Sequence, residues 1–363
     1  MTKLDELIQE LCPDGVEYKE LQEILTIKNG SDYKHLSKGD IPVYGSGGIM
    51  TYVETFSYDK PSVLIPRKGS IDKLYYVEAP FWNVDTIFYT DIDSTQIKPK
   101  YLFYCLQREH LEQYNTAGGV PSLTQAVLNK VQIPVPPLPV QREIVRILDN
   151  FTELTAELTA ELTARKKQYA YYRDKLLTMG TEQVAVCNLG DIADIYTGSK
   201  PNEILDTISD YEYINAGTGN SGYTEQPNCE GDTVTTPSRG QGGIGYVGYQ
   251  SKPFYLGPLC YAIRSKTQEF IINKYIYHWL VSHSSDILVL KNEGGTPALN
   301  KTDLAKIRIK VPPLSVQNRL VEVLDNFDAI CTDLSSGLPA EIEARQKQYE
   351  YYRDKLLSFE EKI

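Results

Sequence analysis

The sequence predicts an α+β protein with two tandem mixed α/β domains, related by pseudo-two-fold symmetry and separated by two long antiparallel coiled-coil helices. Three observations support this prediction. A segment of the chain occurs twice, each copy ends in a long helical pattern, and each globular part contains short strand-like runs interrupted by a helix. With 363 residues, the chain is long enough for two hydrophobic cores.

The duplication is clearest in VPPLPVQREIVRILDNF, which begins at Val135 and returns as VPPLSVQNRLVEVLDNF from Val311. The copies lie 176 residues apart, the difference between those two positions, and this spacing far exceeds solenoid repeats. Both copies close on a similar ending, RKKQYAYYRDKLL and RQKQYEYYRDKLL. Upstream the match continues through GGVPSL and GGTPAL and then fades. We therefore expect a shared scaffold whose divergent loops recognise different targets.

The expected organisation is a globular domain at 1–137, a spacer helix at 138–180, a second domain at 181–313 and a second spacer helix at 314–363. β-Branched and aromatic runs bounded by Gly, Ser and Asp predict the strands IPVYG, SVLIP, KLYYV and DTIFYT, then EYINAG, DTVTTP, IGYVGY and PLCYAI. Helices are predicted at 3–11, 99–113 and 273–282.

Both spacers carry apolar residues at alternating steps of four and three, the pattern of a coiled-coil seam. The first seam is Val140, Ile144, Ile147, Phe151, Leu154 and Leu158, and the second is Val316, Leu320, Val323, Phe327, Ile330 and Leu334. The unit TAEL at 155–158 and 159–162 adds about 6 Å of helix per copy. Gly337 and Pro339 predict a break in the second spacer. Core packing or a protein partner is favoured over base stacking for four spacer tyrosines: Tyr169, Tyr172, Tyr349 and Tyr352.

Composition limits the class of protein. No stretch reaches the roughly 18 apolar residues of a membrane span, so we expect a cytoplasmic protein with no membrane partner. The six cysteines are scattered without a CxxC pair and are expected to be reduced thiols. A net charge of −11 argues against a nucleic-acid partner, because neutralisation of phosphates by Lys and Arg dominates such binding. Glu is dense in the helical segments, however, so basic loops on an acidic framework still permit DNA binding.

Signatures of catalysis are missing from the sequence. It contains no GxxxxGK[ST], HExxH or GxSxG motif, and its four histidines show no metal-ligand spacing. The pattern GxGxxG begins at Gly217 and again at Gly240, but each copy leads into an aromatic strand-like run instead of a helix. We interpret both as glycine-rich turns. The chain is therefore expected to bind no cofactor and no metal, and to have no catalytic residues.

The loops PRKGSIDK at 66–73 and PSRGQGG at 237–243 occupy equivalent places in the two copies. Each places Arg or Lys beside Gly, and Arg can bind guanine in bidentate fashion while Asn or Gln can bind adenine. Similar polar turns lie upstream of both loops. The candidate DNA-binding residues are Lys28, Asn29, Ser31, Tyr44, Ser46, Arg67, Lys68, Ser70, Lys73, Ser199, Lys200, Asn215, Thr218, Asn220, Ser238, Arg239 and Gln241. A solvated turn is the alternative for each single residue, but their recurrence in both copies favours the set.

These residues resemble the DNA specificity subunits of type I restriction-modification systems. The resemblance rests on ELCPDGVEYKEL, on the paired GGxPxL and VPPLxxQ segments, on both RDKLL endings and on the TAEL units. It implies two target recognition domains that read a bipartite asymmetric site in double-stranded DNA, with the TAEL count setting the gap. It also implies a non-catalytic subunit with two methyltransferase subunits and with restriction subunits as partners. S-adenosylmethionine, ATP and Mg would then be bound by those partners.

Two other functions stay open at the level of sequence. The first is a coiled-coil scaffold whose two modules bind non-DNA ligands, such as sugars or peptides. The function of such a scaffold would not change when Arg67, Lys68 and Arg239 are substituted. The second is a nuclease or methyltransferase acting alone, which the absence of an NPPY-like motif and of a methyl-donor loop argues against.

Overall fold

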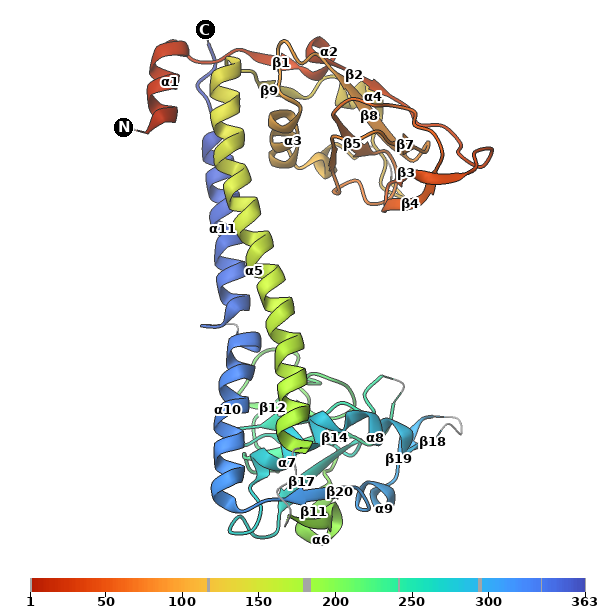
Figure 1. Cartoon of the computed structure of the whole chain (residues 1–363), viewed down its shortest axis with the longest axis vertical. Coiled ribbons are helices and arrows are strands. Elements are labelled where there is room, and N and C mark those ends of the chain that lie inside the picture. Colours follow the sequence, from red (N-terminus) through yellow and green to blue (C-terminus); the bar gives the residue numbers. More distant parts are fainter. Residues whose placement is uncertain are drawn as a thin grey trace. The chain divides into compact units, whose positions relative to one another are not determined.

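The computed structural model describes residues 2–115, 118–178, 184–240, 242–292, 296–333 and 335–362. The chain separates into two compact units, one joining Met1–Thr159 to Ile342–Ile363 and the other spanning Ala160–Glu341 (Figure 1). The boundaries fall within the spacers because each globular part packs on helical segments from both spacers. This partition differs from the four segments expected from the sequence, which stay a prediction.

Two sheets and a short strand pair form the globular part of the first unit. The larger sheet has the order β2 (Leu25–Lys28), β8 (Ile87–Ile92), β5 (Ser62–Pro66) and β6 (Tyr75–Val77). The smaller sheet has the order β4 (Gly48–Val53), β3 (Lys38–Gly45) and β7 (Trp82–Asn83). Strand β1 (Tyr18–Glu20) pairs with β9 (Gln132–Pro134). All these pairs are antiparallel except that of β3 with β7.

Both faces of strand β5 are buried, and four of its five residues are apolar. Val63 and Ile65 join the main core, which also contains buried residues of helix α3 (Pro99–Arg108). Leu64 points to the opposite face, where it packs with Phe81 and Ile87. The period of two in a strand therefore divides one short run between two hydrophobic clusters.

The helices of the first unit begin largely where the sequence predicts. Helix α1 (Lys3–Leu11) has a capping box at Thr2 and ends just before Pro13, as expected. Helix α3 begins at Pro99 but ends at Arg108, so the predicted helix over 99–113 is too long. His110 takes a left-handed conformation with φ of 45°, and a 3-10 turn, η1 (Leu111–Tyr114), follows and buries Leu111. Two further short helices are α2 (Leu21–Ile24) and α4 (Gln125–Leu128).

The second unit repeats both sheets and the short strand pair in the same strand order. Its larger sheet has the order β11 (Ala193–Thr197), β17 (Cys260–Ser265), β14 (Thr233–Pro237) and β15 (Gly248–Gln250). Its smaller sheet has the order β13 (Tyr223–Thr224), β12 (Tyr211–Ile214) and β16 (Tyr255–Leu256), and β10 (Ala185–Asn188) pairs with β20 (Arg308–Val311). The remaining elements are α6 (Leu189–Ile192), α7 (Asn273–Ser282), α8 (Ser284–Val289), β18 (Lys291–Asn292), β19 (Ala298–Leu299) and α9 (Lys301–Leu304).

Each predicted strand overlaps an observed one, and the helix predicted at 273–282 is observed as α7. One strand prediction is largely wrong. Of the run IGYVGY at 244–249, only Gly248 and Tyr249 lie in β15. Gly245 has a φ of 97° and lies in a turn, so the chain bends where the residue types alone favour a strand.

The first spacer is one continuous helix, α5 (Leu138–Thr178), of 41 residues, and it includes both TAEL units. The second spacer is broken as predicted, into α10 (Leu314–Thr332) and α11 (Leu338–Leu356). A Cβ on Gly337 would lie 2.7 Å from the carbonyl oxygens of Ala329 and Asp333, so glycine permits this tight connection. Leu334, the last residue of the predicted seam, lies outside the described residues.

Within each unit the spacer segments pack antiparallel. In the first unit, Phe151 of α5 stacks on Tyr352 of α11 with ring centroids 5.4 Å apart, while Leu357 joins the core beside Val140. In the second unit, Tyr169 and Leu177 of α5 join the same core as residues of α10. The prediction of antiparallel coiled-coil helices is thus confirmed, but the predicted second seam is not buried as a whole, because Val316, Val323 and Ile330 are exposed. The first turns of the first spacer bury Val140 and Ile144 against the globular part that precedes them, whereas in the second spacer Leu320 is the seam residue that packs on the core.

Candidate nucleic-acid interface

Several candidate residues of the first unit lie in loops that follow two strands of its larger sheet, β2 and β5. Strands β2 and β5 both run antiparallel to β8, so their carboxyl ends point the same way. Lys28 and Leu64 are both paired opposite Tyr89, which places the chain after Lys28 and the chain after Pro66 at a common edge. In the second unit β11 and β14 have the same relation to β17, and their carboxyl ends lead to Ser199 and Arg239.

Glycines allow the close approach of backbone at this edge. A Cβ on Gly30 would lie 2.2 Å from the carbonyl oxygen of Val84, and a Cβ on Gly198 would lie 1.8 Å from that of Leu256. No other residue fits either position without a shift of backbone. The glycines that echo each other in the two copies therefore perform the same steric role.

The GGxPxL segment fixes the basic turn of the first unit. The Arg67 amide donates to the carbonyl of Thr86 at 2.8 Å, and the Gly69 amide donates to that of Pro121 at 3.0 Å. The Leu123 amide donates back to the carbonyl of Arg67 at 2.9 Å. Gly69 has a φ of 84°, a conformation that favours glycine.

The turn between β3 and β4 lies beside this basic turn. The Tyr75 hydroxyl donates to the carbonyl of Ser46 at 3.2 Å, and the Ser46 amide lies 3.4 Å from the Thr86 hydroxyl. A Cβ on Gly69 would lie 3.8 Å from the Ser46 hydroxyl. We call residues 44–48 and 66–70 together the first turn cluster.

The second unit builds its basic turn in the same way. The Gly240 amide donates to Pro297 at 3.1 Å, and the Leu299 amide donates to Ser238 at 2.8 Å. Gly240 has a φ of 118°. A Cβ there would lie 3.9 Å from the Cβ of Ala216, so the loop after β12 adjoins the turn. We call residues 215–220 and 237–243 the second turn cluster, in which Gln241 lies outside the described residues.

The two clusters show which basic residues are equivalent. Lys68 pairs with Ser122 and Arg239 with Ala298 in matching single bridges, and both side chains are exposed. In the part of the chain that the structure describes, neither forms an ion pair. Arg67 differs, because its guanidinium lies 5.7 Å from the centre of the Phe88 ring. Its counterpart is the buried Ser238.

Several candidates make contacts inside their own unit. Lys28 pairs with Asp91 at 2.8 Å, and the hydrogen bond to that carboxylate raises the pKa of Lys28. Asn215 accepts a hydrogen bond from the Leu259 amide at 2.9 Å, which orders the turn before β17. The Ser199 hydroxyl lies 3.1 Å from that of Tyr255. Tyr44 is half-buried among the aromatic rings of Tyr75 and Phe81.

The other candidates are more accessible. Asn29, Ser31, Lys73, Lys200, Thr218 and Asn220 have exposed side chains, and Ser46 and Ser70 are half-buried. The residue types alone did not predict that the Pro121 and Pro297 carbonyls of the GGxPxL segments accept hydrogen bonds from the two basic turns. The GGxPxL segment occurs in both copies beside loops that differ, and this recurrence indicates that it belongs to the shared scaffold.

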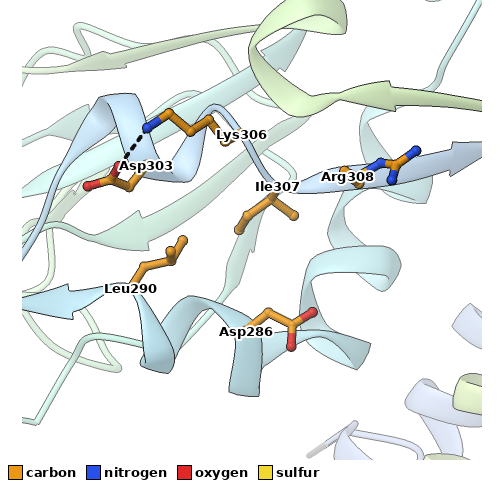
Figure 2. Close-up of a pocket in the computed structure, with 6 residues that line it drawn as sticks. All are labelled: Asp286, Leu290, Asp303, Lys306, Ile307 and Arg308. Carbon is orange, nitrogen blue, oxygen red and sulfur yellow. Dashed lines mark hydrogen bonds and ion pairs between the residues drawn. The ribbon is translucent and has the colours of Figure 1, made fainter.

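Two recesses lie in the second unit. A recess of about 230 Å³ lies among Thr218, Asn220 and Thr235 in the second turn cluster. Another of about 230 Å³ lies between α8, α9 and β20, where Lys306 pairs with Asp303 at 3.1 Å and no candidate residue contributes (Figure 2). Among the described residues no cluster of three His, Cys, Asp or Glu side chains could hold a metal ion, and no helix could cross a membrane.

These features define a class: a duplicated α+β module on long helices, with an exposed cation on an equivalent glycine turn in each copy. A model described as the type I restriction modification DNA specificity domain matches residues 13–165 and 181–344. The chain belongs to this family.

Individual relatives agree with this assignment. The chain is 31% identical to a type I restriction enzyme specificity subunit of Haemophilus influenzae, over 95% of this chain and 96% of that protein. It is 37% identical to the EcoR124I/EcoR124II specificity subunit of Escherichia coli, over 74% and 73%. The crystal structure of the S subunit from M. genitalium has the same fold, with a TM-score of 0.66 at 18% identity over 94% of this chain and 96% of that one.

Proposed function

We propose that this chain is the sequence-specific DNA recognition subunit of a type I restriction-modification complex. In this proposal each unit reads one half of a bipartite asymmetric site, and partner subunits methylate adenine or cleave the DNA. The observation that carries it is the pair of turn clusters. Two copies of one scaffold present a cation on a glycine turn at the same sheet edge, and the side chains around the two cations differ.

In this proposal the chain contacts DNA and its partner subunits perform the catalysis. Lys68 and Arg239 are suited to phosphate or guanine contacts, whereas Thr218 and Asn220 offer hydrogen-bonding groups for base edges. The chain itself is non-catalytic in this proposal. Two methyltransferase subunits bring S-adenosylmethionine, and restriction subunits bring ATP and Mg. Because the net charge is −11, we expect these partners to supply much of the positive charge that binds the duplex.

The family assignment favours this function over a coiled-coil scaffold with two non-DNA ligands. A cytoplasmic location is part of the proposal, since the substrate is DNA. The exposed Lys68 and Arg239 also distinguish DNA recognition from the scaffold function, because a scaffold would tolerate their substitution.

The test is to co-express the chain with a type I methyltransferase subunit and to map methylated adenines across the host genome by long-read sequencing. We expect one bipartite motif with a fixed unspecified gap. Deleting residues 159–162 removes one TAEL unit, shortens α5 by about 6 Å and should change the gap while leaving both half-sites intact. A stable complex that produces no new methylated motif would contradict the proposal.

A further inference from the structure

The hairpin of β3 and β4, with the turn that follows it, carries four large apolar side chains that face solvent. The exposed fractions are 49% for Ile49, 56% for Met50, 50% for Tyr52 and 46% for Phe56. Single exposed apolar residues are common on protein surfaces, but several together on one hairpin indicate a contact surface.

The apolar residues at the tip of this hairpin lie beside the first turn cluster. Ile49 is paired opposite Tyr44, and Gly48 opposite Gly45, so both tip residues adjoin Ser46 and the basic turn of Lys68. Met50 lies across Gly45, where a Cβ would be 2.6 Å from its sulfur. Gly47 has open space around it, which allows the backbone of the tip to approach a partner closely. The surface is therefore apolar at its tip and cationic beside it.

The second unit has a different chemistry at the same place. Between β12 and β13 its chain carries Thr218, Gly219 and Asn220, which are exposed and polar. The scaffold strands correspond, since β4-β3-β7 and β13-β12-β16 share one order. The two units thus present an apolar tip in one case and a polar loop in the other.

Resting on the proposed function, we propose that Ile49 and Met50 read thymine by contacting its C5 methyl group in the major groove. The thymine methyl is the apolar feature that distinguishes base pairs in that groove, and side chains without hydrogen-bonding groups recognise it by contact. DNA is favoured as the occupant because the basic turn beside Ser46 carries the exposed Lys68, whose charge complements that of phosphates. The unit with Thr218 and Asn220 reads its half-site by hydrogen bonds.

The test uses the complex of this chain with its methyltransferase subunits and a duplex that carries the mapped site. Deoxyuridine replaces thymine in one half-site at a time, which removes only the methyl group. We expect affinity to fall about four-fold per contacted methyl in one half-site, close to the effect of burying one methylene. Replacement in the other half-site should have a smaller effect.

The double variant Ile49→Ala/Met50→Ala should bind the unmodified duplex more weakly and lose its sensitivity to deoxyuridine. Ile208→Ala is the matched control, because Ile208 is an apolar residue of the second unit that is 86% exposed. It should retain the sensitivity of the unsubstituted chain. Unchanged thermal unfolding of the double variant would show that its fold is intact.

Two results would overturn the inference. The double variant could remain as sensitive to deoxyuridine as the unsubstituted chain, or neither half-site could respond to loss of the methyl groups. In both cases the unmodified duplex would still be bound and methylated, so the proposed function would stand. Failure to bind the unmodified duplex at all would instead contradict the proposed function.

Discussion

Gln141 and Gln317 show how a single residue can join a spacer to its globular part. The Gln141 side chain is fully buried, accepts from the Lys98 amide at 2.8 Å and donates to the carbonyls of Gln96 and Pro136 at 2.9 and 2.7 Å. Gln317 makes the matching bonds to Ile272, Phe270 and Pro312. One amide group thus pairs three backbone groups where the chain turns into the helix.

We predict that Gln317→Leu destabilises the second unit by about 2–4 kcal/mol, because it leaves a buried amide and two buried carbonyls without partners. Urea unfolding followed by circular dichroism measures this change. Gln346→Leu is the control, since Gln346 is exposed on α11. An unchanged unfolding midpoint for Gln317→Leu would show that the three bonds are not needed.

Lys68 and Arg239 are the residues on which the proposed DNA contact depends most. Both are exposed on glycine turns, whereas Arg67 is partly covered and lies over Phe88. The basic residue types alone did not separate these roles, because Arg67 and Lys68 are adjacent in sequence. The pairing of each turn with its GGxPxL segment separates them.

We predict that Arg239→Ala lowers the DNA affinity of the methyltransferase complex about ten-fold. If Arg239 contacts a phosphate, the slope of log affinity against log salt should also fall by about one. Lys252→Ala is the control, because Lys252 is exposed and follows Gln250, which pairs with Thr233 at the opposite edge of the sheet. Equal affinities for the two variants would refute the assignment of Arg239.

At the scale of elements, the contact between each spacer and its neighbouring helix differs between the two units. In the first, Asp149 of α5 binds Lys100 at 2.9 Å and the Tyr104 hydroxyl. In the second, Asp325 of α10 binds the buried His278 at 2.7 Å and Lys274 at 3.5 Å. The same carboxylate position is therefore retained with different partners.

Asp325 gives the second contact a dependence on pH. Burial alone would raise the pKa of this carboxyl, but the hydrogen bond from His278 and the charge of Lys274 outweigh it and lower the pKa below 3.8. A depressed pKa means that the ionised carboxylate stabilises the folded unit above about pH 4, and that this stabilisation is lost as the pH falls through the folded value.

We accordingly expect Asp325→Asn to melt at a lower temperature than the unsubstituted chain at pH 7, with the difference narrowing below about pH 4. Thermal unfolding across this pH range provides the measurement. Asp286→Asn is a suitable control, because no pair partner of Asp286 is found in the described residues. A difference that stays constant with pH would mean that the charge of Asp325 does not matter.

At the scale of the whole molecule, the two units are assembled differently from the chain. The second unit is one continuous stretch, Ala160–Glu341, whereas the first needs Ile342–Ile363 from the far end. In the first unit the Tyr349 hydroxyl donates to Gln107 at 2.9 Å, and the Tyr18 hydroxyl donates to the carbonyl of Phe359 at 3.1 Å. The fold of the first unit is therefore complete only when segments more than 300 residues apart in sequence pack together.

We predict that a fragment of residues 160–341 unfolds cooperatively on its own, whereas a fragment of residues 1–159 does so only after a peptide of residues 338–363 is added. The buried Leu357 and the stacking of Tyr352 on Phe151 are the contacts that the peptide restores. Circular dichroism during heating would test this, with a scrambled peptide as control. Cooperative unfolding of 1–159 alone would argue against it.

The sequence by itself determined the duplication, the α+β class, the strands β3, β5, β6, β8, β12, β14 and β17, the unbroken first spacer and the break in the second. These depend on local patterns, such as period-two runs, seam spacing and the positions of Gly and Pro, which act over a few residues. The end of α3 at Arg108 and the turn at Gly245 were not predictable in this way, because tertiary burial of Leu111 and positive φ values override local preference.

Only the tertiary structure decided which candidate residues lie together. Strand order brings the ends of β2 and β5 to one edge, and the GGxPxL segment then sets which basic side chain is exposed. The tertiary structure also shows that Lys28, Asn215 and Ser199 each contact another residue of their own unit. The physical reason is that a contact between residues distant in sequence depends on strand pairing and packing, which no local pattern of residue types specifies.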